Sequence, residues 1–257
     1  MNNVVDTIMH RASVRKFKDK SVPEEVVEEI VCAGQQAPFT GQMYSVVATA
    51  DPQVHEQLTE SFGRLAKAPL FMLICVDFNK LEKFIRSKGR INKADDLSML
   101  FLGIQDASYF GQNMVLAAES LGLGSVFLGA APWESDTLSE IFDLPERVYP
   151  LVGLVMGYPD ESPPPRPRIP TEFVLHWDSY SELDEQDTDR ALRVMDAGLL
   201  REGYYRKLNA KIPAGDADEI SYDKYSWSEH VSRKYGQRRR SFMDELKKLL
   251  ASQGIKV

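Results

Sequence analysis

The segment from Asp96 to Leu121 limits the possible folds of this chain more than any other segment. Its apolar residues recur with a period close to the 3.6 residues of an α-helix and cover much of the circumference. They are Leu97, Leu100, Ile104, Ala107, Phe110, Met114, Ala117, Ala118 and Leu121. A helix with so wide an apolar surface must be buried on much of its circumference, so we expect it to be the central helix of the fold.

Segments with the patterns of strands and shorter helices flank this central helix. Runs rich in β-branched and aromatic residues predict strands at 45–49, 70–76, 125–129 and 150–158. Helical spacing predicts a helix from Pro23 to Ala37, with Ser21 opening a capping box, and another at about 54–62. We expect Gly122-Leu123-Gly124 to end the central helix, with Gly124 as a candidate stop. Four strands with intervening helices predict an α+β or α/β sandwich with one core.

The composition of the chain changes at Pro159. Six prolines between Pro159 and Pro170 impose an extended path, so we expect a compact core over residues 1–158. Residues 159–257 are expected to form a Pro-rich crossing and a helical extension, with amphipathic helical patterns at 185–207 and 228–253. Such helices cannot bury their apolar faces unaided, so they must pack on the core or on a second subunit.

The charge balance disfavours two classes of partner. The chain has 31 Lys and Arg residues against 38 Asp and Glu residues, a formal net charge of -7, which repels nucleic acid and anionic lipid surfaces. The basic tract Arg238–Arg240 has acidic neighbours in a helical pattern and predicts a solvated helix face. No stretch approaches the roughly 20 apolar residues of a membrane-spanning helix. We therefore expect no nucleic-acid partner and no membrane association.

The cysteines and histidines indicate a reducing compartment and no zinc site. Cys32 and Cys75 each lie in an apolar run, so both are expected to be buried as small hydrophobic residues. The first residues have no basic segment followed by an apolar one, and we expect a cytoplasmic protein. Four scattered histidines and no cysteine pair at ligand spacing give a zinc site little support.

Two motifs have the residue types that bind a phosphorylated, planar ligand. Arg11, Ser13 and Arg15 place two guanidinium groups and a hydroxyl within five positions, which suits a phosphomonoester, although such a run alone is also typical of a solvated basic turn. The Gly-rich stretch 122–129 lacks the spacing and the strand-to-helix order of a dinucleotide-binding fingerprint. It can instead offer backbone amides and a small-residue gap to a flat ligand, or serve close packing alone.

Several motifs occur in the order found in FMN-dependent nitroreductases. They are Arg11-Ala-Ser-Val-Arg-Lys-Phe17, Gly122-Leu-Gly-Ser-Val-Phe-Leu-Gly-Ala130, Leu151-Val-Gly-Leu-Val-Met-Gly-Tyr-Pro159, Arg166-Pro-Arg-Ile-Pro170 and Trp227-Ser-Glu-His230. The chain resembles group A of that superfamily, the NADPH-dependent oxygen-insensitive nitroreductases and flavin reductases, nearly from end to end. The resemblance implies an α+β nitroreductase-like fold with a central mixed, mostly antiparallel sheet flanked by helices. It also implies a homodimer in which the C-terminal helical extension wraps the partner.

The resemblance also implies an FMN site. By it, Arg11, Ser13 and Arg15 hold the phosphate and pyrimidine side of FMN, and Arg166 and Arg168 return from the Pro-rich crossing to the same cofactor. The residues that line the flavin ring by the same resemblance are Phe127, Leu128, Gly129 and Ala130. No catalytic side chain is implied, because the flavin carries the electron chemistry and the protein positions it.

Further assignments concern the partner subunit, the reduced ring and the nucleotide. Thr40 and Gln42 correspond to residues that one subunit offers to the flavin of the other. Arg166 or Lys16 would stabilise the negative charge of the reduced ring. Candidates for contacts with NADPH are Arg206, Lys207 and Lys211. The chain departs from the group at Ala12 and near Pro132, where the group usually has Arg, and it lacks an obvious Gln before Leu70.

The implied activity is a ping-pong reduction. NADPH or NADH delivers a hydride to N5 of FMN, and a nitroaromatic, a quinone, chromate or free flavin then takes the electrons. Alternatives are a non-catalytic flavin-binding protein, a specialised dehydrogenase or dehalogenase of the same superfamily, and an interaction protein whose basic motif is merely surface.

Overall fold

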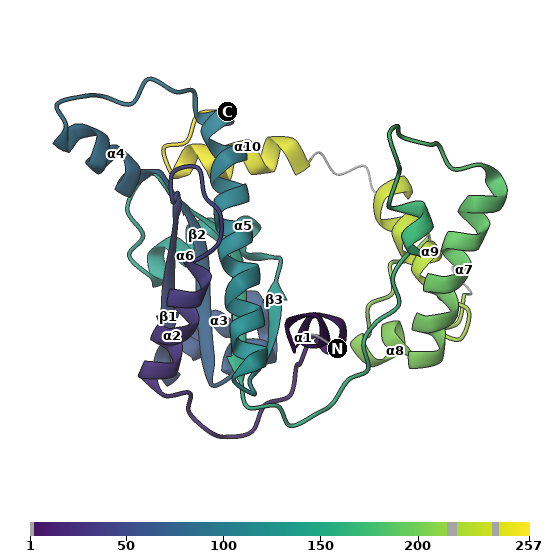
Figure 1. Cartoon of the computed structure of the whole chain (residues 1–257). Coiled ribbons are helices and arrows are strands. Elements are labelled where there is room, and N and C mark those ends of the chain that lie inside the picture. The colour runs from purple at the N-terminus through teal and green to yellow at the C-terminus, as the bar shows by residue number, and fades with distance from the viewer. Residues whose placement is uncertain (1–2, 215–219, 238–241) are drawn as a thin grey trace. The chain divides into compact units, whose positions relative to one another are not determined.

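The structure is a computed structural model that describes residues 3–214, 220–237 and 242–257 (Figure 1). The chain forms two compact units, one of Met1–Pro164 with Ser241–Val257 and one of Pro165–Arg240. The tract Arg238–Arg240, where we predict a solvated helix face, lies outside the described residues. Within the described ranges no helix has both the length and the apolar composition to cross a membrane.

The first unit is built on a four-stranded sheet in the order β1-β2-β4-β3. Its strands are β1 (Tyr44–Thr49), β2 (Leu70–Asp77), β3 (Gly124–Leu128) and β4 (Val148–Gly157). Its helices are α1 (Asn3–His10), α2 (Glu24–Gly34), α3 (Pro52–Phe62), α4 (Phe78–Ser87), α5 (Asp96–Ser120), α6 (Ser135–Ile141) and α10 (Phe242–Ser252), with 3₁₀ turns η1 (Gly63–Lys67) and η2 (Ala131–Glu134). Each of the three strand pairings is antiparallel, with Val46 opposite Ile74 and Val126 opposite Val155. The four predicted strands are confirmed.

Helices cover both faces of this sheet, and β2 is therefore buried along its whole length. Successive residues of a strand point to opposite faces. Met72 and Ile74 pack into the core on the side of α2, α5 and α10, whereas Phe71 and Leu73 pack into the core on the side of α3, η1 and α6. Full burial of side chains of this size stabilises the fold by about 1.5–3 kcal/mol each.

The predicted central helix is confirmed as α5, but only part of its surface is covered. It begins after Asp95, whose carboxylate accepts a hydrogen bond from the Ser98 amide at 2.8 Å. Phe110 and Met114 are buried against the sheet and α2, whereas Phe101 is 65% exposed and Leu97 is 51% exposed. The first unit therefore leaves one apolar face of α5 open, where the sequence predicts burial on much of the helix circumference.

The predicted end of the central helix at 122–124 is confirmed at Gly122, whereas the predicted cap and the predicted last residue of α2 are wrong. Gly122 ends α5 with a φ of +78°, while Gly124 is glycine because a Cβ there would lie 2.6 Å from Val14. Pro23, not Ser21, is the residue before α2, and no side chain caps that helix, which ends at Gly34 rather than at Ala37.

Cys32 is exposed, whereas Cys75 is buried as predicted. Ile30 and Gly34 form the face of α2 that packs on the core. Two residues turn an α-helix by about 200°, so Cys32 lies on the opposite face from both of them.

A partly buried ion cluster joins α4, α5 and the C-terminal segment of the first unit. The Arg147 guanidinium bonds both carboxylate oxygens of Asp96 at 2.7 Å and Glu82 at 2.7 Å, and it donates to the Gly254 carbonyl at 2.8 Å. The Lys256 amide also donates to Asp96, at 2.7 Å. The side chains of the three charged residues are at most 18% exposed.

The second unit is helical. Its elements are η3 (Thr171–Phe173), α7 (Glu185–Glu202), α8 (Tyr204–Leu208), α9 (Trp227–Ser232) and a π turn, η4 (Arg233–Gln237). The predicted helix at 185–207 is divided at Gly203, whose φ is +63°. The predicted helix at 228–253 is described as α9 and η4 in this unit and as α10, which packs through Leu249 and Leu250 on the core of the first unit.

Candidate functional site

The segment Arg11–Lys18, called the strap below, is fixed along one end of the sheet. Ser13 forms a parallel bridge with Ser125 of β3, and Phe17 forms an antiparallel bridge with Pro159 beyond β4. The parallel bridge agrees with the predicted mixed, mostly antiparallel pairing. Val14 donates its amide to the Ser125 carbonyl at 3.0 Å and buries its side chain against Gly124. Because neighbouring residues of an extended segment point in opposite directions, burial of Val14 directs Ser13 and Arg15 away from the core.

Two buried polar groups, one on the strap and one beside it, have no hydrogen-bond partner among the described residues. The Nε atom of Arg11 is buried, and it finds no hydrogen-bond partner within the described part of the chain. The same holds for the Ser125 hydroxyl next to the strap. Burial raises the pKa of Glu119, and the positive charge of Arg11 opposes this rise. A buried guanidinium donor without an acceptor fits a phosphate group, whose oxygens accept charge-assisted hydrogen bonds.

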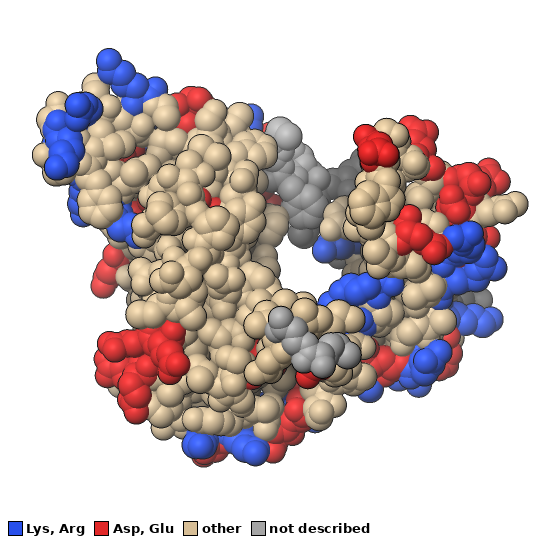
Figure 2. Space-filling view, viewed as in Figure 1, with Lys and Arg blue, Asp and Glu red and all other residues tan. Residues whose placement is uncertain are grey.

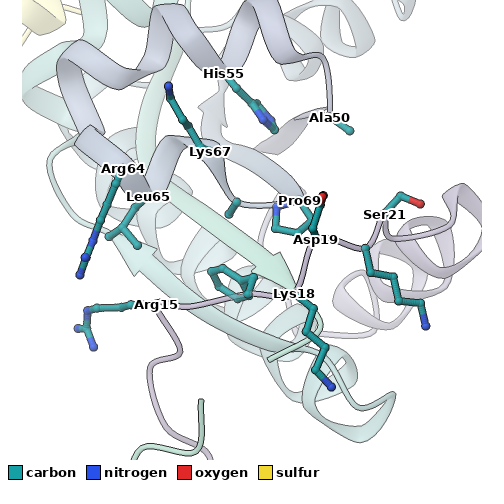
Figure 3. Close-up of a pocket in the computed structure, with 13 residues that line it drawn as sticks. Arg15, Lys18, Asp19, Ser21, Ala50, His55, Arg64, Leu65, Lys67 and Pro69 are labelled. Carbon is teal, nitrogen blue, oxygen red and sulfur yellow. The ribbon is translucent and has the colours of Figure 1, made fainter. Parts of the chain in front are cut away.

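Glu161 holds the strap at Arg15. Its carboxylate accepts the backbone amides of Arg15 and Lys16 at 2.6 and 3.0 Å. The Arg15 side chain is half-buried and donates to the Ser13 carbonyl at 3.2 Å. The Glu161 charge is thus engaged by the backbone, and the Arg15 guanidinium lines a hollow beside the strap (Figure 3).

The end of β3 leaves room for a flat ligand. Leu128 is buried and Phe127 half-buried, whereas Gly129 and Ala130 are exposed just before η2. A Cβ at Gly129 would meet no atom within 4 Å. Close packing therefore explains Gly124 but not Gly129, and the space beside Gly129 fits the approach of a planar ring.

The loop that contains Thr40 and Gln42 depends on a residue that the sequence prediction missed. Asp106 of α5 is 1% exposed, and its carboxylate accepts the amides of Thr40 at 2.7 Å, Gly41 at 2.9 Å and Met43 at 3.1 Å. The only sequence signal for this role is an acidic residue at a core position of the central helix. Gln42 adopts a φ of +49°, so the loop is held in an unusual conformation.

One chain does not bring this loop to the strap. The loop leads into β1 at one edge of the sheet, and the strap follows β3 at the other. Three strand spacings, roughly 14 Å, separate these edges. The contact of Thr40 and Gln42 with the flavin of a partner subunit stays a prediction.

The remaining predicted residues lie in the second unit. Arg166 stacks 3.8 Å above the Tyr204 ring and lies 3.6 Å from Glu202, while Arg168 is exposed and bonds the Pro167 carbonyl at 2.9 Å. Approach of Arg166 and Arg168 to the strap stays a prediction.

The three candidates for nucleotide contacts are close in sequence but differ in the contacts that they make within the protein. Arg206 forms an ion pair with Asp223, and Lys211 donates to the Ile220 carbonyl at 2.5 Å. Lys207 is exposed. Their contact with NADPH also stays a prediction.

Residues 8–64 and 46–158 match the model of the nitroreductase family. The chain belongs to this family. It is 29% identical over 264 residues to a protein named FMN reductase (NAD(P)H) of Bacillus subtilis (strain 168), with coverage of 100% of this chain and 99% of that protein. It is 30% identical over 250 residues to an oxygen-insensitive NADPH nitroreductase of Salmonella typhimurium (strain LT2), with coverage of 95% and 96%.

The fold agrees with this family. A solved structure of NfrA2 from B. megaterium matches with a TM-score of 0.84 and 29% identity, over 100% of this chain and 99% of that one. The predicted family and the predicted α+β nitroreductase-like fold are thereby confirmed.

Proposed function

We propose that this member of the nitroreductase family uses FMN and NADPH or NADH to reduce nitroaromatics, quinones, chromate or free flavin. The names of its relatives, FMN reductase and NADPH nitroreductase, support an NAD(P)H-dependent flavin enzyme. One observation carries the assignment to residues. Arg11 and Arg15 lie on a strap that is bonded to β3, the strand whose exposed end at Gly129 leaves open space.

In this proposal the residues of the chain bind and orient, and none acts as a nucleophile. When bound, FMN accepts a hydride from the nucleotide and passes the electrons to the acceptor in a ping-pong cycle. Arg11 and Arg15, with Ser13 beside them, neutralise the phosphate and hold the pyrimidine side. Phe127, Leu128, Gly129 and Ala130 bound the ring at the end of β3.

The proposal also assigns residues of the Pro-rich crossing and of the segment after it. Arg166 and Arg168 are assigned to the cofactor, as the resemblance implies. Arg166 or Lys16 places a positive charge at the pyrimidine edge, where negative charge collects on reduction. Arg206, Lys207 and Lys211 are the candidate contacts for the nucleotide.

The proposal includes a homodimer. No residue of α1 is buried, and Val4 and Met9 are 62% and 64% exposed. Phe101 and Leu97 add to this apolar surface on α5, and the surface over α5 in Figure 2 is largely free of charged groups. Apolar area of this kind marks an interface. A second copy would cover it and bring Thr40 and Gln42 of one subunit to the flavin of the other.

We also place the enzyme in the cytoplasm, where NAD(P)H is supplied. Both cysteines are free thiols in the structure, as a reducing compartment favours.

Anaerobic titration of the purified protein tests this function. We expect flavin absorption bands in the preparation, loss of those bands on addition of NADPH, and their return on addition of a nitrofuran. Sedimentation velocity of the same sample should give a mass twice the 29.1 kDa of one chain. A flavin that NADPH and NADH both fail to reduce would show a non-catalytic flavin-binding protein, and a colourless preparation that does not take up FMN would contradict the cofactor.

A further inference from the structure

The hollow beside the strap, which Arg15 lines, belongs to the first unit and carries many positive charges (Figure 3). Its volume is about 510 Å³, which is typical of small-molecule sites. The strap and the residues after it form one wall, and η1 with part of α3 forms the other. We call it the basic groove. Its charged residues are Arg15, Lys18, Lys20, Arg64 and Lys67, with Asp19 as the one carboxylate among the lining residues.

The basic groove is positively charged, whereas the chain as a whole has a negative net charge. The net charge is -7, yet five cations face one hollow, and their mutual repulsion is relieved when an anion enters. Figure 3 shows Arg15 from the strap and Arg64 from η1 at the same end of the groove. Lys18 lies farther along the strap, near the middle of the view. The cations are thus distributed along the groove, as an extended anionic ligand requires.

Two of these cations have no carboxylate partner among the described residues. In the part of the chain that the structure describes, neither Lys18 nor Arg64 has an ion-pair partner. Lys67 pairs with Glu56 at 2.8 Å, but both side chains are more than half exposed, and such pairs are weak enough to exchange for a ligand. Glu161, the acidic residue at the strap, is engaged by backbone amides.

The floor of the basic groove is apolar. Phe17 and Leu65 line it, and both also pack on the core of the first unit behind it. Ala68 and Pro69 add further apolar surface. A basic rim above an apolar floor suits a compound that joins phosphate groups to a planar or apolar body better than it suits a bare inorganic ion.

We propose that the basic groove binds the phosphate group of a phosphorylated small-molecule substrate, outside the FMN site. This inference rests on the proposed function for the identity of the substrate. Two substrates of that function have the required chemistry, because NADPH differs from NADH by one phosphate and FMN differs from riboflavin by one phosphate. Arg15 lies on both the strap and the groove wall, so a ligand bound here lies next to the flavin.

Binding of inorganic pyrophosphate to the FMN-loaded, desalted protein tests the groove itself. Calorimetric titration should detect binding to the wild type, and the double variant Lys18→Gln with Arg64→Gln should bind at least about tenfold more weakly, because charge-assisted hydrogen bonds to phosphate are lost. The matched control is Lys88→Gln with Lys93→Gln, which removes the same charge from an exposed loop and should bind like the wild type. Absence of binding to the wild type, or equal binding by all three proteins, would overturn the proposal.

Steady-state kinetics of the same three proteins separate the two substrates. If NADPH uses the groove, the groove variant raises the KM for NADPH about tenfold and leaves the KM for NADH unchanged. If FMN as a diffusible acceptor uses it, the KM for FMN rises and that for riboflavin does not. Equal effects on phosphorylated and unphosphorylated substrates, or no effect on any, would refute a substrate role. A protein without reductase activity refutes the proposed function, and the calorimetry still decides whether the groove binds phosphate.

Discussion

Asp106 shows how a single buried charge can shape the site without touching a ligand. Its carboxylate bonds three backbone amides of the loop between α2 and β1, with Thr40 and Gly41 among the donors. A buried carboxylate is tolerated only when it is well bonded, so the loop and Asp106 stabilise each other. The side chains of Thr40 and Gln42 are left exposed by this arrangement. Asp106 is thus a positioning residue for the side chains that we assign to the flavin of the partner subunit.

Substitution Asp106→Asn tests this role. The amide group keeps the size of the side chain but cannot accept from all three donors, and each buried donor left without an acceptor costs about 1–3 kcal/mol. We expect the dissociation constant for FMN to rise about tenfold, measured by quenching of flavin fluorescence. The control Leu138→Ala destabilises the core on the other side of the sheet. Unchanged FMN affinity in Asp106→Asn, or an equal loss in the control, would show that Asp106 acts on stability alone.

Arg147 joins elements that are distant in sequence. It adopts a φ of +71° and bonds Glu82 of α4, Asp96 of α5 and the carbonyl of Gly254. The hydrogen bond from Arg147 is the main cause that lowers the pKa of Asp96, and burial opposes it. Since a lowered carboxyl pKa favours the folded state only while the group is ionised, the cluster stabilises the fold above the pKa of an unfolded Asp, about 3.9.

Asp96→Asn should therefore destabilise the protein in a pH-dependent way. Near pH 7 we expect a loss of about 2 kcal/mol in the free energy of unfolding, because the partly buried Arg147 loses one of its two carboxylate partners. The loss should begin to shrink as the pH falls below about 4, where Asp96 of the unfolded chain takes up its proton, and should vanish only below the lowered pKa of folded Asp96. Urea denaturation at several pH values measures it. In an Arg147→Ala background the same substitution should show no such pH dependence; a loss that is constant with pH in both backgrounds would contradict this account.

Patterns of apolar residues predicted the sheet and α5, because β2 and the inner face of α5 are buried along their length. They missed α4, whose exposed surface is charged and whose start is set by Asp77, which caps the Lys80 amide at 2.8 Å. They also misplaced Ser21 and Cys32, because a capping motif and an apolar run do not say which face of a helix meets the core. Local sequence patterns thus predict strands and long helices better than they predict short, polar helices.

The residues of the proposed site are far apart in the sequence, and only the resemblance to a known family grouped them into one site. The strap and the end of β3 meet in the first unit, through the bridge between Ser13 and Ser125. Arg166 and Arg168 belong to the second unit, and the loop with Thr40 leads to the opposite edge of the sheet. Contacts of this range depend on tertiary and quaternary packing, which no local spacing encodes. Asp106 and the basic groove were not predicted for the same reason.

The central claim is that the strap guanidinium groups bind the phosphate of FMN, and a comparison of FMN with riboflavin tests it most directly. Both ligands are titrated by flavin fluorescence into apoprotein of the wild type and of the variants Arg11→Gln and Arg15→Gln. We predict that each variant binds FMN about tenfold or more weakly and binds riboflavin as the wild type does, since only the phosphate loses a charge-assisted hydrogen bond. An unchanged ratio of FMN to riboflavin affinity in both variants would contradict the claim.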